Sequence, residues 1–310
     1  MLLAVANPEG RGYSFAIRHT RKKGANMIEI RHKDTGDVLE TLEAETFVGA
    51  DLREMRLNGA NFRGADLSGA NLELSDLIEA DLSGATLRNA VLLGAHLNRA
   101  NLAGADLTRA RLGSEHPSRS AMLSGADLSS VNLEGADLRN AEIRQANLQG
   151  ANLSGADLRG TDFYGSNLCH VTARKALFIR ANLRETNLCG ADLRDSHLND
   201  ANLVRASMHE ADLSSVHQGG FTVINLANME GADLRGANLR NVSAQDTNMR
   251  NADLRDADFS EAVLGGAILR RANVANADFN GVELASVTME FANFSKARNA
   301  VIPAYKKNLR

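Results

Sequence analysis

The sequence predicts an elongated all-β solenoid, and three observations lead to that fold class. A five-residue pattern recurs from Glu45 to Arg298: a small residue, Asn or Asp, Leu or Phe, then two mostly polar positions. Aromatic residues make up only 4% of the chain and Trp is absent, which indicates a narrow core built from Leu and Ala. One internal period over most of the 310 residues is typical of a single elongated unit whose repeats contact their neighbours.

The five-residue spacing requires the chain to turn a corner at every repeat. Five residues of α-helix rotate by about 500°, which leaves successive Leu side chains about 140° apart. In one straight strand, successive Leu side chains would point to opposite faces. A short extended segment with one bend per repeat instead sends the small residue and the Leu inward and the Asn or Asp outward. Core centres predicted in this way include Phe62, Leu67, Leu72, Phe163, Phe178, Phe259 and Phe279.

This motif resembles that of the pentapeptide-repeat family, and the resemblance covers residues 45–298. The family fold implies a right-handed parallel β-helix of square, quadrilateral cross-section with four repeats per coil. About 12 coils would then form a rod roughly 58 Å long, at the spacing of neighbouring strands. Residues twenty apart should stack, such as Phe259 and Phe279. Ala173 should lie opposite Phe163, and we expect the coil 161–180 to be locally irregular.

The segments outside the repeat are expected to extend or cap the rod. Residues 1–26 are interpreted as a flexible extension; a basic docking arm and a natural start at Met27 are the alternatives. Residues 27–44 alternate apolar and polar positions around turn-forming residues, which predicts a β-hairpin that caps the first coil. Residues 299–310 are expected to form a C-terminal cap or tail.

Two breaks interrupt the repeat. Leu123 follows Leu112 after a step of eleven residues where a regular step is five, which predicts an outward loop at 113–120. Ile224 also follows Leu213 after a step of eleven, which we interpret as two repeat steps and a bulge near 219–220.

The loop 113–120 is the candidate partner-contact element. A rod tolerates insertions on its surface, so that an insertion without function is one interpretation. Loops on a rigid scaffold also commonly carry recognition. In that case the contact groups would be Glu115, His116, Pro117 and Arg119.

Cys169 and Cys189 lie one expected coil apart, with Cα atoms near 4.8 Å, and His170 follows Cys169. This distance falls inside the disulfide range. Parallel stacked side chains point the same way, however, and a cytosolic setting keeps thiols reduced. We therefore expect stacked free thiols, with a metal site or a redox pair as the alternative.

No catalytic or cofactor motif is found, and neither a cofactor nor a metal is expected. Asp137 should stack with Asp157 and Asp192 with Asp212, but Arg residues such as Arg139 should neutralise them. General acid–base catalysis needs a pocket that shifts pKa values, and a filled rod offers none. The sequence therefore predicts a protein that is not an enzyme.

Charge and hydropathy limit the classes of partner that the sequence predicts. The net charge is −3, and residues 45–298 carry −7, which argues against direct nucleic-acid binding. No apolar run approaches the roughly 18 residues of a membrane helix, and we expect a cytoplasmic protein.

Two functions fit these features. The first is a non-catalytic interaction scaffold, a rigid rod that binds a protein partner through its polar faces and its loop. The second follows from the resemblance: some family members look like B-form DNA, bind type II topoisomerases such as DNA gyrase, and protect them from quinolones, a form of antibiotic resistance. This chain departs from that group because 25 Lys and Arg within residues 45–298 dilute the acidic charge of that region. Its tail also lacks a clear apolar helix, so that a dimer through the C-terminal end stays an open question.

Overall fold

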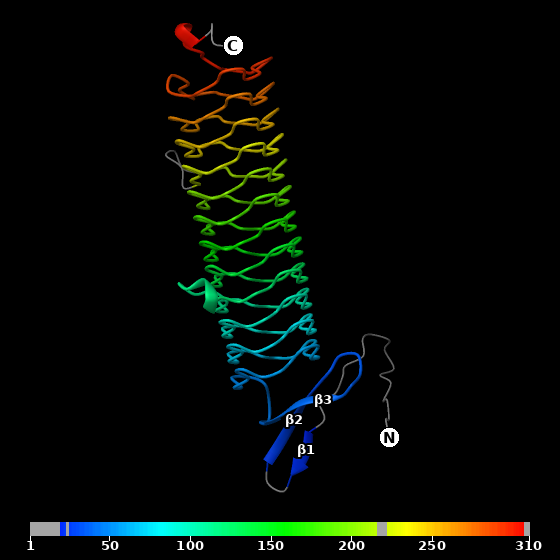
Figure 1. The fold of residues 1–310 in the computed structure, drawn as a ribbon. Coiled ribbons are helices and arrows are strands. Elements are labelled where there is room, and N and C mark those ends of the chain that lie inside the picture. Colours follow the sequence, from blue (N-terminus) through cyan, green and yellow to red (C-terminus); the bar gives the residue numbers. More distant parts are fainter. Residues whose placement is uncertain (1–18, 23–24, 216–221, 307–310) are drawn as a thin grey trace.

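The structure is a computed structural model that describes residues 19–22, 25–215 and 222–306. Figure 1 shows an elongated stack of chain turns with a small sheet at its N-terminal end. The named elements are β1 (His19–Lys22), β2 (Ala25–Arg31), β3 (Val38–Glu43) and two 3₁₀ helices, η1 (Pro117–Arg119) and η2 (Ala304–Lys306). Within these ranges no helix has the length and apolar character needed to span a bilayer.

Between the sheet and η2, the turns are joined by isolated parallel bridges between residues twenty apart, as the repeat predicts. The bridges fall into four columns of outward residues, which begin at Asp51, Arg56, Asn61 and Asp66. We call these columns faces 1 to 4, and each face includes the two turn residues that follow each of its core centres. The four columns fix which outward side chains are neighbours along the rod.

Backbone hydrogen bonds explain why the stack is regular. The amide of Leu67 donates to the carbonyl of Thr86, nineteen residues on (2.7 Å), and the amide of Asn71 donates to the carbonyl of Ala50, twenty-one residues back (2.9 Å). Within the repeat, the amide of Ala70 donates to the carbonyl of Leu67 (3.0 Å) and closes the corner. These bonds satisfy polar backbone groups that the corner would otherwise bury.

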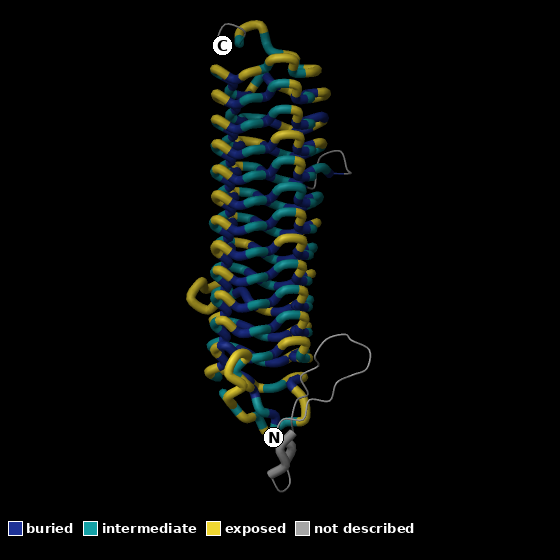
Figure 2. Tube along the Cα trace, turned by 90° about the vertical axis from the view of Figure 1, so that its right-hand side faces the viewer, coloured by how far each residue is buried: buried dark blue, intermediate teal, exposed yellow. Residues whose placement is uncertain are grey.

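The predicted core centres are confirmed. Phe62, Leu67, Leu72, Phe163, Phe178, Phe259 and Phe279 are each at most 1% exposed, and buried positions run the length of the stack in Figure 2. The rings of Phe259 and Phe279 stack with centroids 5.3 Å apart. The expected irregularity of residues 161–180 is wrong, because the bridge-and-turn pattern continues through them. The ring of Phe163 packs on that of Phe178 (6.2 Å), so that side chains rather than the backbone absorb the variation in volume.

The N-terminal sheet has the antiparallel order β1-β2-β3. Strands β2 and β3 occupy the span of the expected hairpin, and Ile28 and Ile30 are buried in the same core as the repeats. The expectation of a flexible extension up to residue 26 is wrong for β1, which pairs with the edge of β2 that would otherwise be open. The rest of that extension lies outside the described residues.

Both breaks preserve the four columns. His96 bridges Met122, and His197 bridges Val223, so that each break adds six residues to the usual spacing of twenty. The second break is therefore one step with a six-residue insertion, and the interpretation as two steps and a bulge is wrong. An additional step would have moved every later residue to the next face. The expected bulge at 219–220 itself lies outside the described residues.

The C-terminal segment lies against the last turns. The hydroxyl of Tyr305 donates to the carbonyl of Ala285 (3.0 Å), and the Nζ of Lys306 donates to that of Val287 (2.6 Å). The described residues up to Lys306 are therefore hydrogen-bonded to backbone carbonyls of the last turns.

The stacked rings near the C-terminal end provide a test of core packing. We expect Phe259→Ala to lower the free energy of unfolding by about 3–5 kcal/mol, since it removes a buried ring. Phe259→Leu should cost clearly less, because Leu239 occupies the same column one coil earlier. Urea denaturation followed by circular dichroism measures both, and equal losses would contradict the packing described here.

Candidate functional site

The four faces differ in composition. Faces 3 and 4 carry mostly Asn, Asp and Thr at their outward positions. Face 1 carries apolar side chains at several of these positions, namely Val91, Leu177, Val223 and Val263. Among faces 1, 3 and 4, face 1 is therefore the one on which apolar side chains lie among charged ones.

Face 3 is organised by a ladder of side-chain amides. The Nδ2 of Asn147 donates to Asp127, that of Asn167 to Asn147, and that of Asn187 to Asn167, each at 3.2 Å. These bonds join side chains of adjacent coils, so the ladder stabilises the stack and holds its outward surface in one conformation.

Carboxylates on face 4 are paired with Arg. Arg174 and Arg194 contact Asp192 at 2.6 Å and 2.7 Å, and Arg194 also lies 3.5 Å from Asp212. Burial raises the pKa of Asp192, but the hydrogen bonds from Arg194 and Arg174 outweigh it and lower the pKa to about 2. Such a group stays ionised near neutral pH and cannot donate a proton.

A second Arg network lies on face 1 beside the loop. Arg139 contacts Asp137 (2.7 Å) and Asp157 (3.6 Å) and pairs with Glu115 of the loop. The stacking of Asp137 with Asp157 and their neutralisation by Arg139 and Arg159 are thus confirmed. Burial raises the pKa of Asp157, the bonds from Arg159 and the charge of Arg139 lower it, and the net shift is downward. This cluster has the character of an ion-pair network and lacks a group poised for acid–base chemistry.

The loop 113–120 projects from the rod and carries η1 (Figure 1). It is braced on both sides: Arg119 pairs with Glu73 (2.9 Å), the hydroxyl of Ser120 donates to the carbonyl of Arg139 (2.9 Å), and the Nδ2 of Asn140 donates to that of Ser114 (2.8 Å). Of the candidate contact groups, Glu115 and Arg119 therefore also anchor the loop, while His116 and Pro117 are exposed at its tip. The contact role of all four stays a prediction.

Gly113 begins the loop, and its structural role does not follow from the repeat pattern. A Cβ at this position would lie 2.0 Å from the amide nitrogen of Arg139 and 2.5 Å from the carbonyl carbon of Leu138. Both atoms belong to the backbone of the next coil and cannot move independently. The signal in the sequence was a glycine directly after a core centre, at a position usually occupied by a larger side chain.

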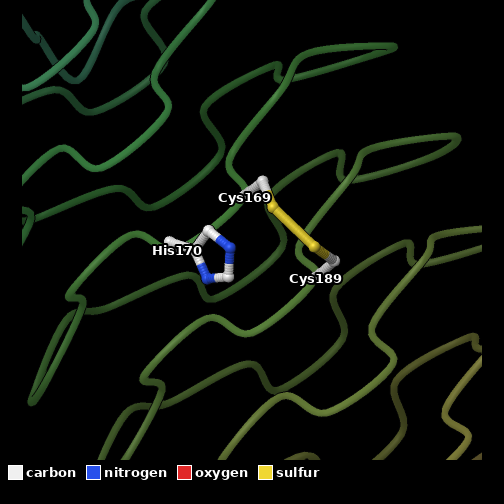
Figure 3. A group of neighbouring side chains, drawn as sticks. All are labelled: Cys169, His170 and Cys189. Atoms are coloured by element: carbon white, nitrogen blue, oxygen red, sulfur yellow. A yellow bond between two sulfur atoms is a disulfide. The ribbon is translucent and has the colours of Figure 1, made fainter.

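Cys169 and Cys189 form a disulfide, with Cα atoms 4.7 Å apart. The expectation of free thiols is wrong, although the expected spacing is confirmed, because adjacent coils lie within the range that a disulfide spans. Figure 3 shows the pair with His170 beside it. The ligand atoms of the three residues lie within 4.8 Å of one another.

The family model described as pentapeptide repeats matches residues 46–83, 75–113, 121–160, 136–172, 176–214, 227–266 and 266–298, more than half of the chain. The chain belongs to the pentapeptide-repeat family. A search of curated proteins finds no match.

Several solved structures are similar to this pentapeptide-repeat protein. HetL from the cyanobacterium Nostoc sp. strain PCC 7120, described as involved in regulating heterocyst differentiation, is 28% identical over 78% of this chain and 89% of its own, with a TM-score of 0.28. Full-length QnrB1, described as a plasmid-mediated fluoroquinolone resistance protein, is 17% identical over 74% and 92%, with a TM-score of 0.33. Rfr23 from the cyanobacterium Cyanothece 51142 is 31% identical over 38% and 84%, with a TM-score of 0.17.

Two hollows lie on the described surface of this pentapeptide-repeat protein. One hollow on face 2 is lined by Arg184, Val204, Arg205, Glu230, Gly231 and Asn251. A second, near the C-terminal end, is lined by a set that includes Glu261, Glu283 and Ser286. Within the described residues, neither set places a nucleophile against a base.

Substitution of Gly113 tests the close contact between the start of the loop and the next coil. We expect Gly113→Ala to lower the free energy of unfolding by about 1–3 kcal/mol, because its Cβ must displace the next coil. Cleavage of the loop by protease should also become faster. Gly64→Asn is the matched control, since nothing lies within 4 Å of its Cβ and Asn89 adopts the same left-handed backbone. Equal effects of the two substitutions in urea denaturation would contradict the close approach at Gly113.

The pairing of Asp192 predicts a pH dependence of stability. Its pKa in the folded chain is about 2 against an ordinary 3.8, so the stabilisation is complete above about pH 4 and is lost as the pH falls through about 2. Asp192→Asn should therefore lower the melting temperature most near pH 6, and the difference from wild type should shrink towards pH 2. Thermal unfolding over this range measures it, and a difference that grows on acidification would refute the pairing.

Proposed function

We propose that this pentapeptide-repeat protein is a non-catalytic scaffold that binds a protein partner through face 1 and the loop 113–120. The observation that carries the proposal is the replacement of Asn and Asp by Val and Leu on face 1. Apolar groups surrounded by charged ones are typical of the surfaces with which proteins bind one another.

The exposure of individual side chains supports this choice of face. Leu74 is 52% exposed, Leu226 58% and Val263 44%, and all three belong to face 1. The two insertions also adjoin it, since the core centres Leu112 and Ile224 lie in its column. A partner could therefore contact apolar side chains on the rod and polar groups of the loop 113–120 together.

A scaffold of this kind depends on a rigid rod. We infer a right-handed quadrilateral winding of about 12 coils, as the family resemblance implies. The four bridge columns support the quadrilateral section.

The alternative proposal is a DNA mimic that binds a type II topoisomerase such as DNA gyrase. A mimic of DNA needs a continuous acidic surface, and face 4 is the one richest in Asp. On that face Arg88 pairs with Asp106, Arg174 with Asp192 and Arg298 with Asp278. Positive and negative groups thus alternate, which favours the scaffold.

Photocrosslinking distinguishes the faces. A photoreactive residue placed at Leu177 or Leu226 should crosslink the full-length protein to a partner in extracts of its host. The same residue at Asn167 on face 3, at the height of Leu177, should not. Leu177→Asp with Leu226→Asp should then weaken binding of the purified partner at least about tenfold, the loss expected for central apolar contacts.

Two results would overturn the assignment. Equal crosslinking from face 3 and face 1 would remove the case for face 1. Protection of purified gyrase from a quinolone by stoichiometric protein, unaffected by the double Asp variant, would favour the DNA-mimic alternative.

A further inference from the structure

The cluster of Cys169, His170 and Cys189 is built on the amide ladder of face 3. The amide of Cys169 donates to the Oδ1 of Asn167 (3.2 Å), and that of Cys189 to the Oδ1 of Asn187 (3.1 Å). The amide of His170 donates to the carbonyl of Cys189 (2.8 Å). The ladder and the coil spacing therefore hold both cysteines in the same orientation on adjacent coils, with the imidazole beside them (Figure 3).

Room for the imidazole comes from Gly190. A Cβ at that position would lie 2.5 Å from the Nδ1 of His170 and 2.8 Å from its Cε1. The ring therefore lies over a glycine next to the two sulfur atoms. Both cysteines are half-buried and His170 is exposed, so that solvent and small ions reach the group.

Two thiolates and one imidazole form a donor set that suits a zinc ion. Zinc prefers sulfur and nitrogen ligands in a tetrahedron, and sites with three protein ligands take water as the fourth. The ligand atoms already lie within 4.8 Å of one another, and rotation of short side chains brings them around one ion.

We propose that the reduced form of this cluster binds one zinc ion through Cys169, Cys189 and His170, and that the disulfide is its metal-free form. Reduction by an external dithiol adds two electrons and two protons to the disulfide and gives two thiols, while the dithiol becomes a disulfide itself. Zinc binding then releases the two thiol protons to solvent. Because the cluster lies on face 3, this inference is independent of the partner-binding role of face 1.

Cobalt is the probe that tests the site. Full-length protein is reduced with a phosphine, which becomes its oxide, freed of metal with a chelator, and titrated with Co²⁺. One equivalent should produce a thiolate-to-cobalt charge-transfer band and the visible bands of a tetrahedral ion, and Zn²⁺ should abolish both. The unreduced protein should give no band, and its cysteines should resist alkylation.

Matched variants separate ligation from folding. Cys169→Ser and Cys189→Ser should each abolish the charge-transfer band and still fold, because Ser83 and Ser129 occupy the equivalent position in the same column. His170→Ala keeps both thiols and should weaken binding at least about tenfold. His96→Asn, an exposed histidine on face 2, should leave the affinity unchanged.

Either of two outcomes overturns the proposal. The first is the absence of a charge-transfer band in reduced wild-type protein whose thiols are both free to alkylation. The second is a band of unchanged affinity in His170→Ala, which would remove the imidazole from the site. Circular dichroism of each variant confirms that a lost band reflects lost ligands.

Discussion

The hydrogen bonds between coils are the constraint on which the rest of this structure depends. Away from the insertions, most core centres donate their amides to a carbonyl nineteen residues on, and most outward residues donate to one twenty-one residues back, as at Leu67 and Asn71. The two bonds flank a bridge between residues twenty apart. Once this spacing is set, the composition of each face and the stacking of Cys169 on Cys189 follow from counting along the chain.

The interior is filled, which places the chemistry of this protein on its surface. Polar residues occur at small inward positions, but their hydroxyls are satisfied: Ser75 donates to the carbonyl of Leu72 and Thr161 to that of Leu138, both at 2.7 Å. These bonds let Ser or Thr replace Ala without leaving a buried donor unpaired. The outward side chains that share a face are therefore the groups that solvent or a partner can reach.

Much of the fold could be predicted from the sequence because a period of five fits neither a helix nor a straight strand. Core centres such as Phe163 and the spacing of Cys169 from Cys189 followed from that period. The disulfide did not, because sequence spacing places two cysteines together but does not decide their oxidation state. The second break was misassigned because eleven residues fit both a bulge and an insertion, and only the bridge between His197 and Val223 decides between them. The close contact of Gly113 with Arg139 depends on where the loop returns, which the period does not specify.

The two six-residue insertions have a consequence for how such a chain can change in length. After each insertion the chain continues in the column that it would have reached without the insertion, so that residues on either side stay on the same face. Loss or gain of a single five-residue repeat acts differently, because it moves every later residue to the next of the four columns and carries the apolar side chains of face 1 onto a neighbouring face. An inserted loop therefore leaves the outward residues of each face in line. Added repeats keep them in line only when they come in whole coils of twenty residues.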